Sequence, residues 1–412
     1  MPNLRWLAWK GGIVEWTVNR GRTMFDPARI DTLYPHWVEL RRAFHREPEL
    51  AFEETATAEK IMAELDRLGI AYDYQGKGGG VIGRIEGAPA GPTVALRAEM
   101  DALPGTEITG QPFASRIPGK MHACGHDAHM TMLLGAAHLL QEASPPGRVL
   151  LVFQPAEEKG GGSRVIIRSG ALQGVRAIFG GHVTHHYRVG EIMVGEGVVT
   201  AQSDGFTIRI RGRGGHGARP HEAIDAVVIA GFLITAFQTL ISRETDPLHP
   251  SVVTIGRVEG GSAANVIAEE AILEGSLRTT WPEARGHLHA GMRRMVKALA
   301  ELHQAEIDLE IREGYPPVVN SPLETRIARR AIAELVGEKH LVPMEHPSMG
   351  SEDFAFYLEQ LAGCYVRFGA RLRENEYIPL HSPAFDIDEA VLKVGAGYFA
   401  QVAWEALRTY AE

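Results

Sequence analysis

The sequence predicts an α/β fold in which a mixed sheet covered by helices is interrupted by an inserted ferredoxin-like α+β domain. The 412 residues exceed the size at which one hydrophobic core usually stops growing, so two domains are expected. Short apolar runs alternate with helical segments between Thr93 and Val183, and again after Tyr315. Between Asp204 and Tyr315 the elements instead follow the order β-α-β-β-α-β.

The two flanking parts, residues 24–200 and 315–412, supply the larger domain. The apolar runs "TVALRAEM", "RVLLVFQP" and "VRAIFGGHV" are typical of buried strands, and "CYVRFGA" adds another after the insertion. Helices are expected at about 127–142, near 163–169, and at 323–336, 352–361 and 388–408. This alternation indicates a largely parallel or mixed sheet with helices over it.

The inserted part, residues 201–314, begins with "DGFTIRIRGRGG", which alternates apolar and polar residues as a half-buried strand does. A long apolar helix is expected from Ala223 to about Arg243, followed by two strands, "SVVTIGRVEGG" and "EEAILEGSLRT". An amphipathic helix, "ARGHLHAGMRRMVKALAELH", and a last strand, "EIDLEIREGY", complete the unit. In such a split βαβ unit, antiparallel strands carry both helices on one face.

Composition and charge favour a globular protein that acts on small molecules. Apolar residues make up 45% of the chain and charged residues 23%, which are ordinary values. The formal net charge of −9 gives no basic footprint, which argues against nucleic acid as the main partner. Two cysteines, Cys124 and Cys364, cannot form a disulfide framework, so a reducing compartment, the cytoplasm, is expected.

No segment predicts export or insertion into a membrane. The first twenty residues lack the continuous apolar stretch of a signal peptide. The longest apolar run, residues 226–241, is shorter than the roughly 20 residues of a membrane span and carries Gln238, so a buried helix is expected. Helical periodicity begins only after Met24, and we interpret Met24 as nearer to the natural start than Met1.

Chemically reactive side chains gather where the predicted strands of the larger domain end. They are Glu99 and Asp101, then Glu157 and Glu158, and then His182. The stretch "MHACGHDAHM" (121–130) adds Cys124 and His126 at the start of a helix. Ligands of open α/β sheets bind outside the carboxyl ends of the strands, so these side chains are expected to converge on one cleft.

The mixture of residue types indicates a metal site. Thiolate, imidazole and carboxylate ligands together suit a borderline divalent ion such as zinc, cobalt, nickel or manganese. The helix N-terminus and the metal should both lower the pKa of the Cys124 thiol, which favours the thiolate that binds metal.

Each residue also has a structural interpretation. A single cysteine before an apolar helix is more often a small buried hydrophobic residue than a ligand, and a Glu-Glu pair after a proline is by default a solvated helix start. His182 could cap a turn, while His122 and His129 could orient ligands or serve the structure alone.

Three further motifs are weak signals by themselves. His216, in "GRGGHGARPH", lies in a glycine-rich turn. Ser351 and the acidic residues after it, in "GSEDFAFYL", are typical of a capped helix start. His381, in "PLHSPAF", lies between prolines in a rigid loop.

Taken together, these motifs resemble the M20 metallopeptidase family, and more narrowly its amidohydrolase branch of hippurate, N-acyl-amino-acid and auxin-conjugate hydrolases. The resemblance runs from about Arg41 to His381, in the family's order. Its motifs are "HREPELAFEE", "AEMDALP", "MHACGHDAHMTMLLGAAHLL", "FQPAEE", "GGHV", "GRGGHGARPH", "GSAANVIAEEAILEGSLRT", "GSEDFAFYL" and "PLHSP".

The resemblance implies a catalytic domain with an inserted dimerisation domain, a homodimer or homotetramer, and two divalent metal ions per subunit. The implied metal ligands are Cys124, His126, Glu158, His182 and His381. Glu157 would be the general base, and Asp101 would support the metal site from behind. His216 would reach a partner subunit's site and stabilise the oxyanion. Asn265 and Arg278 would hold the carboxylate of a small N-acyl-amino-acid substrate.

The implied reaction is amide hydrolysis by a metal-activated water, with Glu157 moving the proton from water to the leaving amine. The alternatives are a dipeptidase or carboxypeptidase of the same superfamily, and a non-catalytic binding protein. The presence of Glu157 and of every implied ligand argues against the last. "GGHVTHHYRVGEI" departs from the branch's usual sequence, which leaves the acyl group open, as are the native metal and the choice between dimer and tetramer.

Overall fold

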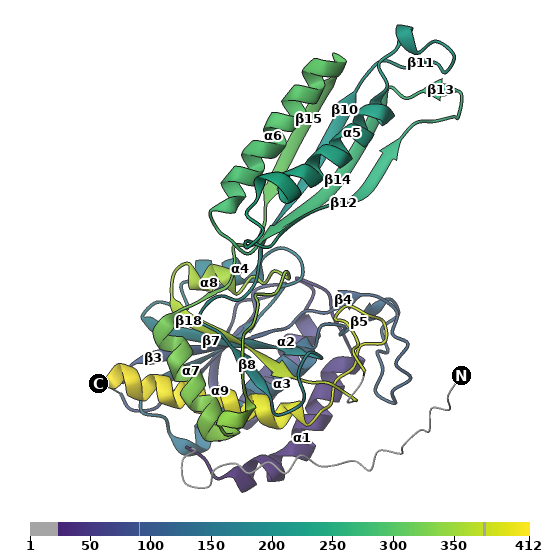
Figure 1. Ribbon diagram of the computed structural model, residues 1–412. Helices are drawn as coiled ribbons and strands as arrows, with labels where there is room; N and C mark the ends of the chain where they lie inside the picture. The colour runs from purple at the N-terminus through teal and green to yellow at the C-terminus, as the bar shows by residue number, and fades with distance from the viewer. Residues whose placement is uncertain (1–23, 90, 374–375) are drawn as a thin grey trace, which may run out of the picture. The chain divides into compact units, whose positions relative to one another are not determined.

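The structure, a computed structural model, describes residues 24–89, 91–373 and 376–412. The interpretation that Met24 is nearer to the natural start than Met1 concerns residues 1–23, which lie outside the described residues. The chain forms two compact units (Figure 1). One contains the chain up to Val194 with Leu323–Pro343 and Gly363–Glu412, and the other contains Gly195–Pro322 with Met344–Ala362. The last segment joins the second unit through backbone hydrogen bonds between Ser348 and Val199 and between Ala201 and Ser348.

A mixed eight-stranded sheet forms the centre of the first unit. Its order is β1 (Ala71–Tyr74), β2 (Val81–Ile85), β6 (Arg148–Gln154), β3 (Thr93–Glu99), β7 (Val175–Thr184), β18 (Ala362–Gly369), β8 (Ile192–Val194) and β17 (Leu341–Pro343). β3 runs parallel to both β6 and β7, whereas β2 is antiparallel to β6. The ends of β3, β6 and β7 therefore meet at one edge, as the sequence predicts for the central strands.

Helices cover this sheet. They are α1 (Pro27–Arg46), α2 (Thr55–Arg67), α3 (His126–Ala143), α4 (Gly162–Arg168), α7 (Pro322–Leu335) and α9 (Val391–Ala411). α3 and α9 pack against each other and against β3 and β7, and α1 packs on both helices. Because it is enclosed on all sides, α3 is buried from His126 to Leu140, which explains its nearly continuous apolar sequence. Short pieces complete the unit: β4 (Leu103–Pro104), β5 (Lys120–Met121) and a 3₁₀ turn at Glu338–His340. The predicted mixed α/β fold is confirmed.

The second unit contains a four-stranded antiparallel sheet in the order β12 (Ser251–Gly260), β14 (Glu270–Thr279), β10 (Gln202–Arg211) and β15 (Glu306–Glu313). The helices α5 (Ala226–Thr239) and α6 (Ala284–His303) pack on the sheet and enclose a second core. Alternate residues of β10, Phe206, Ile208 and Ile210, point into this core. Short pairs, β9 (Gly197–Val198) with β16 (Val319–Asn320) and β11 (Gly215–His216) with β13 (Val266–Ile267), and a 3₁₀ turn at Pro220–Glu222 complete it.

Two sequence expectations are wrong in detail. Among the described residues one helical stretch, Ala226–Glu244, is apolar and long enough to cross a membrane, and only 33% of its most apolar window is buried. The sequence predicted a buried helix, but only one face packs on the sheet, so Val228 and Phe232 stay exposed. The helix expected at 352–361 is only α8 (Ala355–Leu358), and the Glu352 carboxylate before it accepts the amide of Phe354 (3.0 Å).

Candidate active site

A glycine turn at the start of α3 brings two candidate ligands together. Gly125 has φ 91°, a conformation that glycine adopts readily and other residues rarely adopt. A Cβ atom there would lie 2.3 Å from Cγ2 of Val183, the neighbour of His182. Cys124 precedes the turn and His126 opens the helix, so both side chains lie beside the end of β7. The order Cys-Gly-His is therefore a geometric requirement.

Two imidazoles direct their Nε2 atoms toward this place. Nδ1 of His126 lies 2.8 Å from the carbonyl oxygen of Asp101, and Nδ1 of His182 lies 2.7 Å from that of Val183. Carbonyl oxygens only accept hydrogen bonds, so each Nδ1 carries a proton and each Nε2 is the ring nitrogen that a cation could bind after losing any proton of its own. Nε2 of His182 lies 3.2 Å from Sγ of Cys124, and the buried Nε2 of His126 has no hydrogen-bond partner.

The carboxylates come from the turn after β6. Asp101 accepts the amides of Glu157 and Glu158 through its two oxygens, each at 3.0 Å, and so fixes the direction of both side chains. Oε1 of Glu158 lies 3.2 Å from Nε2 of His381, whose backbone amide donates to the carbonyl of Ala123 (2.8 Å). The loop that holds His381 is thus tied to the segment that holds Cys124.

These side chains form overlapping sets of possible metal ligands. Each set has its ligand atoms within 4.8 Å of one another: Cys124, His126 and His182; Cys124, Glu158 and His381; and His126, Glu157 and Glu158. The structure therefore brings together all five residues that the sequence named as ligands, with Glu157 beside them. An unpartnered imidazole nitrogen of His126, the Glu158 carboxylate and the Cys124 thiol fit a divalent cation.

The charge of the cluster also calls for a cation. Although burial opposes its charged form, hydrogen bonding to Asp101 and the carboxylates of Glu99 and Glu158 raise the pKa of His126 to about 10. Burial, with the charges of Glu158 and Glu157, raises the pKa of the Cys124 thiol well above its ordinary value. The sequence expectation was that the helix terminus and a metal together lower this pKa; without a metal the pKa is raised, because burial and the carboxylates disfavour the thiolate. A thiolate here depends on a bound cation.

The neighbouring histidines orient the cluster. His129 accepts the amide of Val183 at Nε2 (3.0 Å) and contacts Glu99 through Nδ1 (2.8 Å), so it anchors the strand end beside His182. Both its nitrogens are therefore occupied, and it serves as a support. His122 is buried without a hydrogen-bond partner at either ring nitrogen, and burial lowers its pKa to about 3.

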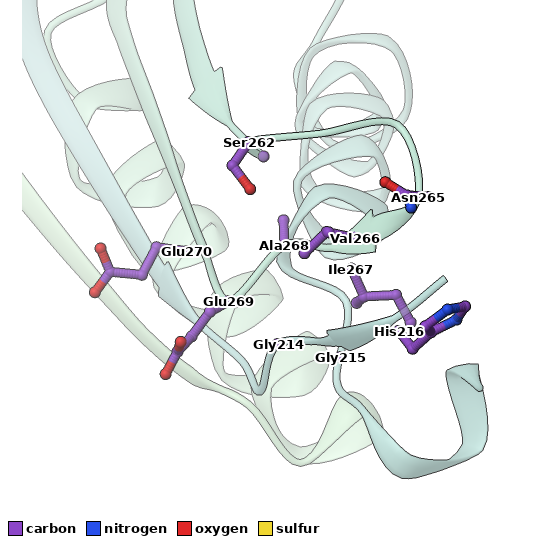
Figure 2. Close-up of a pocket in the computed structure, with 11 residues that line it drawn as sticks. Gly214, Gly215, His216, Ser262, Asn265, Val266, Ile267, Ala268, Glu269 and Glu270 are labelled. Atoms are coloured by element: carbon purple, nitrogen blue, oxygen red, sulfur yellow. The ribbon is translucent and has the colours of Figure 1, made fainter. Parts of the chain in front are cut away.

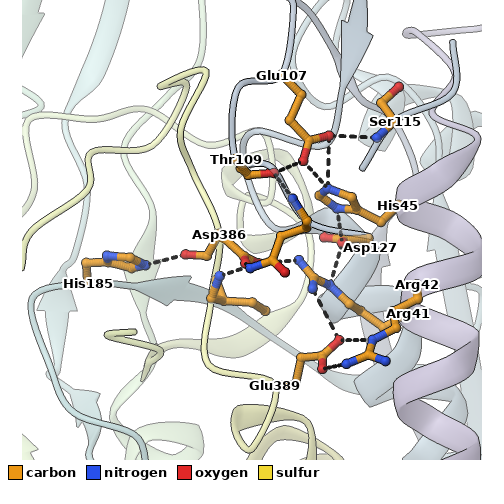
Figure 3. A network of polar contacts seen from close by, with 12 residues as sticks. Arg41, Arg42, His45, Glu107, Thr109, Ser115, Asp127, His185, Asp386 and Glu389 are labelled. Atoms are coloured by element: carbon orange, nitrogen blue, oxygen red, sulfur yellow. Dashed lines mark hydrogen bonds and ion pairs between the residues drawn. The ribbon is translucent and has the colours of Figure 1, made fainter. Parts of the chain in front are cut away.

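A buried ion network holds the segments behind the cluster (Figure 3). The Arg41 guanidinium of α1 donates to Asp127 (2.7 Å), the residue after His126, and to Asp386 (3.0 Å), in the loop that follows His381. Arg41 is 1% exposed, so the network is shielded from water. Sequence reasoning gave Arg41 no role, although the segment that resembles the family begins there; its partners lie 86 and 345 residues away.

Another histidine cluster, His36, Glu64 and His138, meets the same distance criterion. There the Arg67 guanidinium already donates to Glu64 (2.7 Å) and contacts His138, and the indole of Trp37 donates to Nδ1 of His138 (3.2 Å). A cation bound at Nε2 of His138 would require a proton on Nδ1 of that ring. Two N–H donors, that one and the indole N–H of Trp37, would then face each other. This cluster is satisfied by its own arginine.

In the second unit, His216 and Asn265 line a pocket of about 880 Å³ (Figure 2). Both lie on the same side of the pocket in this view, away from Glu269 and Glu270. The β11 and β13 pairing and the bond from Gly217 N to the Asn265 carbonyl (2.8 Å) bring them together. Nδ1 of His216 accepts the amide of Ala218 (3.1 Å), which leaves Nε2–H free to donate.

Arg278 does not join this pocket. It lies near the other end of β14, eight residues after Glu270 and about 26 Å along an extended strand. Its guanidinium donates to the carbonyl of Met349 (2.9 Å). Within a single chain, Asn265 and Arg278 therefore cannot hold the same small carboxylate.

Comparison with known proteins identifies the family. The sequence profile of "Peptidase family M20/M25/M40" matches residues 95–405. The chain belongs to this family. It is 38% identical to "IAA-amino acid hydrolase ILR1-like 4" of Arabidopsis thaliana over 91% of this chain and 87% of that protein. It is 40% identical to the "N-acetylcysteine deacetylase" of Bacillus subtilis strain 168 over 90% of this chain and 97% of that one.

Among solved structures, the M20 protein YXEP of Bacillus subtilis, described as a dinuclear metal-binding peptidase, aligns with a TM-score of 0.80 and 36% identity. The alignment covers 92% of this chain and 99% of that one. The relatives place the chain in the amidohydrolase branch of M20, as the motifs predict. As a member of that branch, the protein is a metal-dependent hydrolase of carbon–nitrogen bonds.

Proposed function

We propose that this M20 enzyme hydrolyses the amide bond of N-acyl-amino acids or related small amides, using two divalent cations per subunit. The observation that carries the proposal is the pair of three-ligand sets that share Cys124, one completed by His126 and His182 and the other by Glu158 and His381. Zinc, manganese, cobalt or nickel would suit this donor set. The name of the dinuclear relative and those of the two deacylating relatives agree with it.

Cations bound there would supply two effects, acidification of a water molecule and polarisation of the scissile carbonyl. Glu157 would accept the proton of the attacking water and deliver it to the leaving amine. It suits this role because its amide is anchored on Asp101 while its side chain stands at the ligand cluster, 7% exposed. Asp101 would hold Glu157 and Glu158 in register.

We also propose a homodimer, with tetramers as a further possibility, in which each active site uses two chains. His216 would donate from Nε2–H to the oxyanion, and Asn265 and Arg278 would bind the substrate carboxylate. The separation of Arg278, near the end of β14, from the pocket that Asn265 lines supports a site that takes these residues from different subunits. The exposed apolar face of α5, with Val228 and Phe232, suits an interface. Two buried free cysteines suit the cytoplasm.

Glu157→Gln tests the reaction. The amide side chain keeps the shape but cannot take a proton, so kcat should fall about 10²–10⁴-fold while metal content stays at the wild-type value. The measurements are metal analysis and hydrolysis of N-acetyl-amino acids, N-benzoyl-amino acids and dipeptides. Retained turnover would remove Glu157 as base. A preference for dipeptides would favour the peptidase alternative, and no turnover of any amide by metal-loaded wild type would favour a binding protein.

Mixing two inactive variants tests the shared site. Glu157→Gln and His216→Ala subunits, unfolded and refolded together, would form mixed dimers in which one active site contains both native residues. Activity should reappear in the mixture and stay absent when each variant is refolded alone. No recovery in a mixture shown to be dimeric would place His216 within its own subunit or outside the reaction.

A further inference from the structure

The turn between β6 and the two glutamates has an unusual backbone. Ala156, which directly precedes Glu157, has φ 50° and is completely buried. A left-handed conformation is unfavourable for a residue with a Cβ atom, so it persists only where surrounding contacts hold it. This residue connects the end of β6 to Glu157 and Glu158, so its backbone conformation contributes to the direction in which they leave the strand.

Two buried carboxylates hold the turn. Asp101 accepts the amides of Glu157 and Glu158. The amide before them, that of Ala156, donates to Oε1 of Glu54 at 2.8 Å, across 102 residues of sequence. The Ala156 carbonyl accepts the amide of Gly162 (3.1 Å). Three consecutive amides are thus each fixed by a carboxylate from another part of the chain.

The Glu54 side chain accepts the Ala156 amide and does not cap the helix that it precedes. Glu54 stands at the N-cap of α2, yet its side chain makes no capping hydrogen bond to that helix. Its side chain is buried, with the residue 3% exposed, and Oε2 has no hydrogen-bond partner. The first turn of α2 is instead supported by Glu49, which accepts the amides of Ala56 (3.2 Å) and Thr57 (2.7 Å).

We propose that Glu54 is a positioning residue for the active site, which through the Ala156 amide holds Glu157 and Glu158 in their working orientation. The inference rests on the proposed function for the role of Glu157, but its effect on Glu158 concerns metal binding alone. Glu54 lies behind the turn and touches neither substrate nor metal in this scheme.

Three variants separate this role from general stability. Glu54→Ala removes the acceptor of the Ala156 amide, whereas Glu54→Gln keeps an oxygen at Oε1. Burial raises the pKa of Glu54 to about 7, so a neutral side chain is a close substitute. Glu49→Ala is the matched control, because it removes hydrogen bonds from the same end of α2 and leaves the Ala156 amide satisfied.

The experiment measures zinc affinity by competition with a chromophoric chelator, together with kcat and KM on an N-acetyl-amino acid. Glu54→Ala should weaken zinc binding and lower kcat by about 10–100-fold each, as is typical when a group that supports a metal ligand is lost, with KM nearly unchanged. Glu54→Gln should restore both quantities. Glu49→Ala should lower the thermal midpoint and leave zinc affinity and kcat at wild-type values.

A second change checks the mechanism of positioning. Glycine adopts a positive φ freely, so Ala156→Gly should regain zinc affinity when combined with Glu54→Ala. A merely structural Glu54 would give no such rescue. The inference is overturned if Glu54→Ala, folded by circular dichroism, binds zinc and turns over like wild type, or if Glu49→Ala matches its losses. If zinc affinity follows the pattern but wild type hydrolyses no amide, the positioning role stands and the proposed substrate fails.

Discussion

Replacing Gly125 by alanine tests the close approach that assembles the candidate metal site. The new Cβ atom would lie 2.3 Å from Cγ2 of Val183, about 1.1 Å inside the 3.4 Å at which ordinary contacts begin. Val183 is completely buried on β7 and cannot turn aside into solvent. The start of α3 and the end of β7 must therefore move apart, and they carry His126 and His182.

The energetic effect has two parts. A left-handed alanine costs about 1–2 kcal/mol, and overpacking of a buried contact adds about 1–3 kcal/mol. The free energy of unfolding should therefore fall by about 2–5 kcal/mol. Because ligands must be held to within about 0.5 Å, zinc affinity should also fall, by about 10–100-fold.

Gly174→Ala is the matched control. Gly174 has φ 81° and lies directly before β7, but a Cβ there would meet nothing within 4 Å. It should lose only the backbone part, about 1–2 kcal/mol, and bind zinc normally. Urea unfolding of the metal-free variants and zinc titration measure both quantities. Equal destabilisation by the two variants, with zinc affinity preserved in Gly125→Ala, would refute the reasoning.

Three further predictions concern the first unit. Cys124→Ala should lower the metal content per subunit because both ligand sets include the thiol; elemental analysis with unchanged stoichiometry would remove Cys124 from the ligands. Arg41→Ala should lower the free energy of unfolding by about 3–5 kcal/mol, since it strands buried carboxylates. The control Arg29→Ala breaks an exposed ion pair and should lower the free energy of unfolding by less than about 1 kcal/mol in the same urea titration. Similar losses for Arg41→Ala and Arg29→Ala would show that the buried network stabilises the fold no more than an exposed pair does. Although burial opposes ionisation, hydrogen bonds from His45 and the Ser115 amide lower the pKa of Glu107 from 4.5 to about 2, so its ionised form stabilises the fold above pH 4.5. The stability difference between wild type and Glu107→Gln should therefore narrow as pH falls from 4.5 toward 2, and a constant difference would show that ionisation is irrelevant.

The chain's local patterns were enough to predict the fold class and the place of the site. Apolar runs with two different periods distinguish strands from helices before any contact is known, because the side chains of each element repeat along one face. The glutamates after β6 and His182 in β7 stand at strand ends, which parallel pairing with β3 brings to one edge. Cys124 and His126 fall on one turn because a single glycine separates them.

Only the tertiary structure decided which of these side chains are fixed in place and which residues fix them. The Ala156 amide meets Glu54 across 102 residues, and Arg41 meets Asp386 across 345. Such contacts leave no periodic pattern in the sequence, since they arise where separate elements pack. They also depend on atomic positions that must be right to within a few tenths of an ångström. The same holds for the pKa of Cys124, which burial and neighbouring carboxylates raise. Residue types and their order thus determined what chemistry is present, and packing determined its geometry and charge.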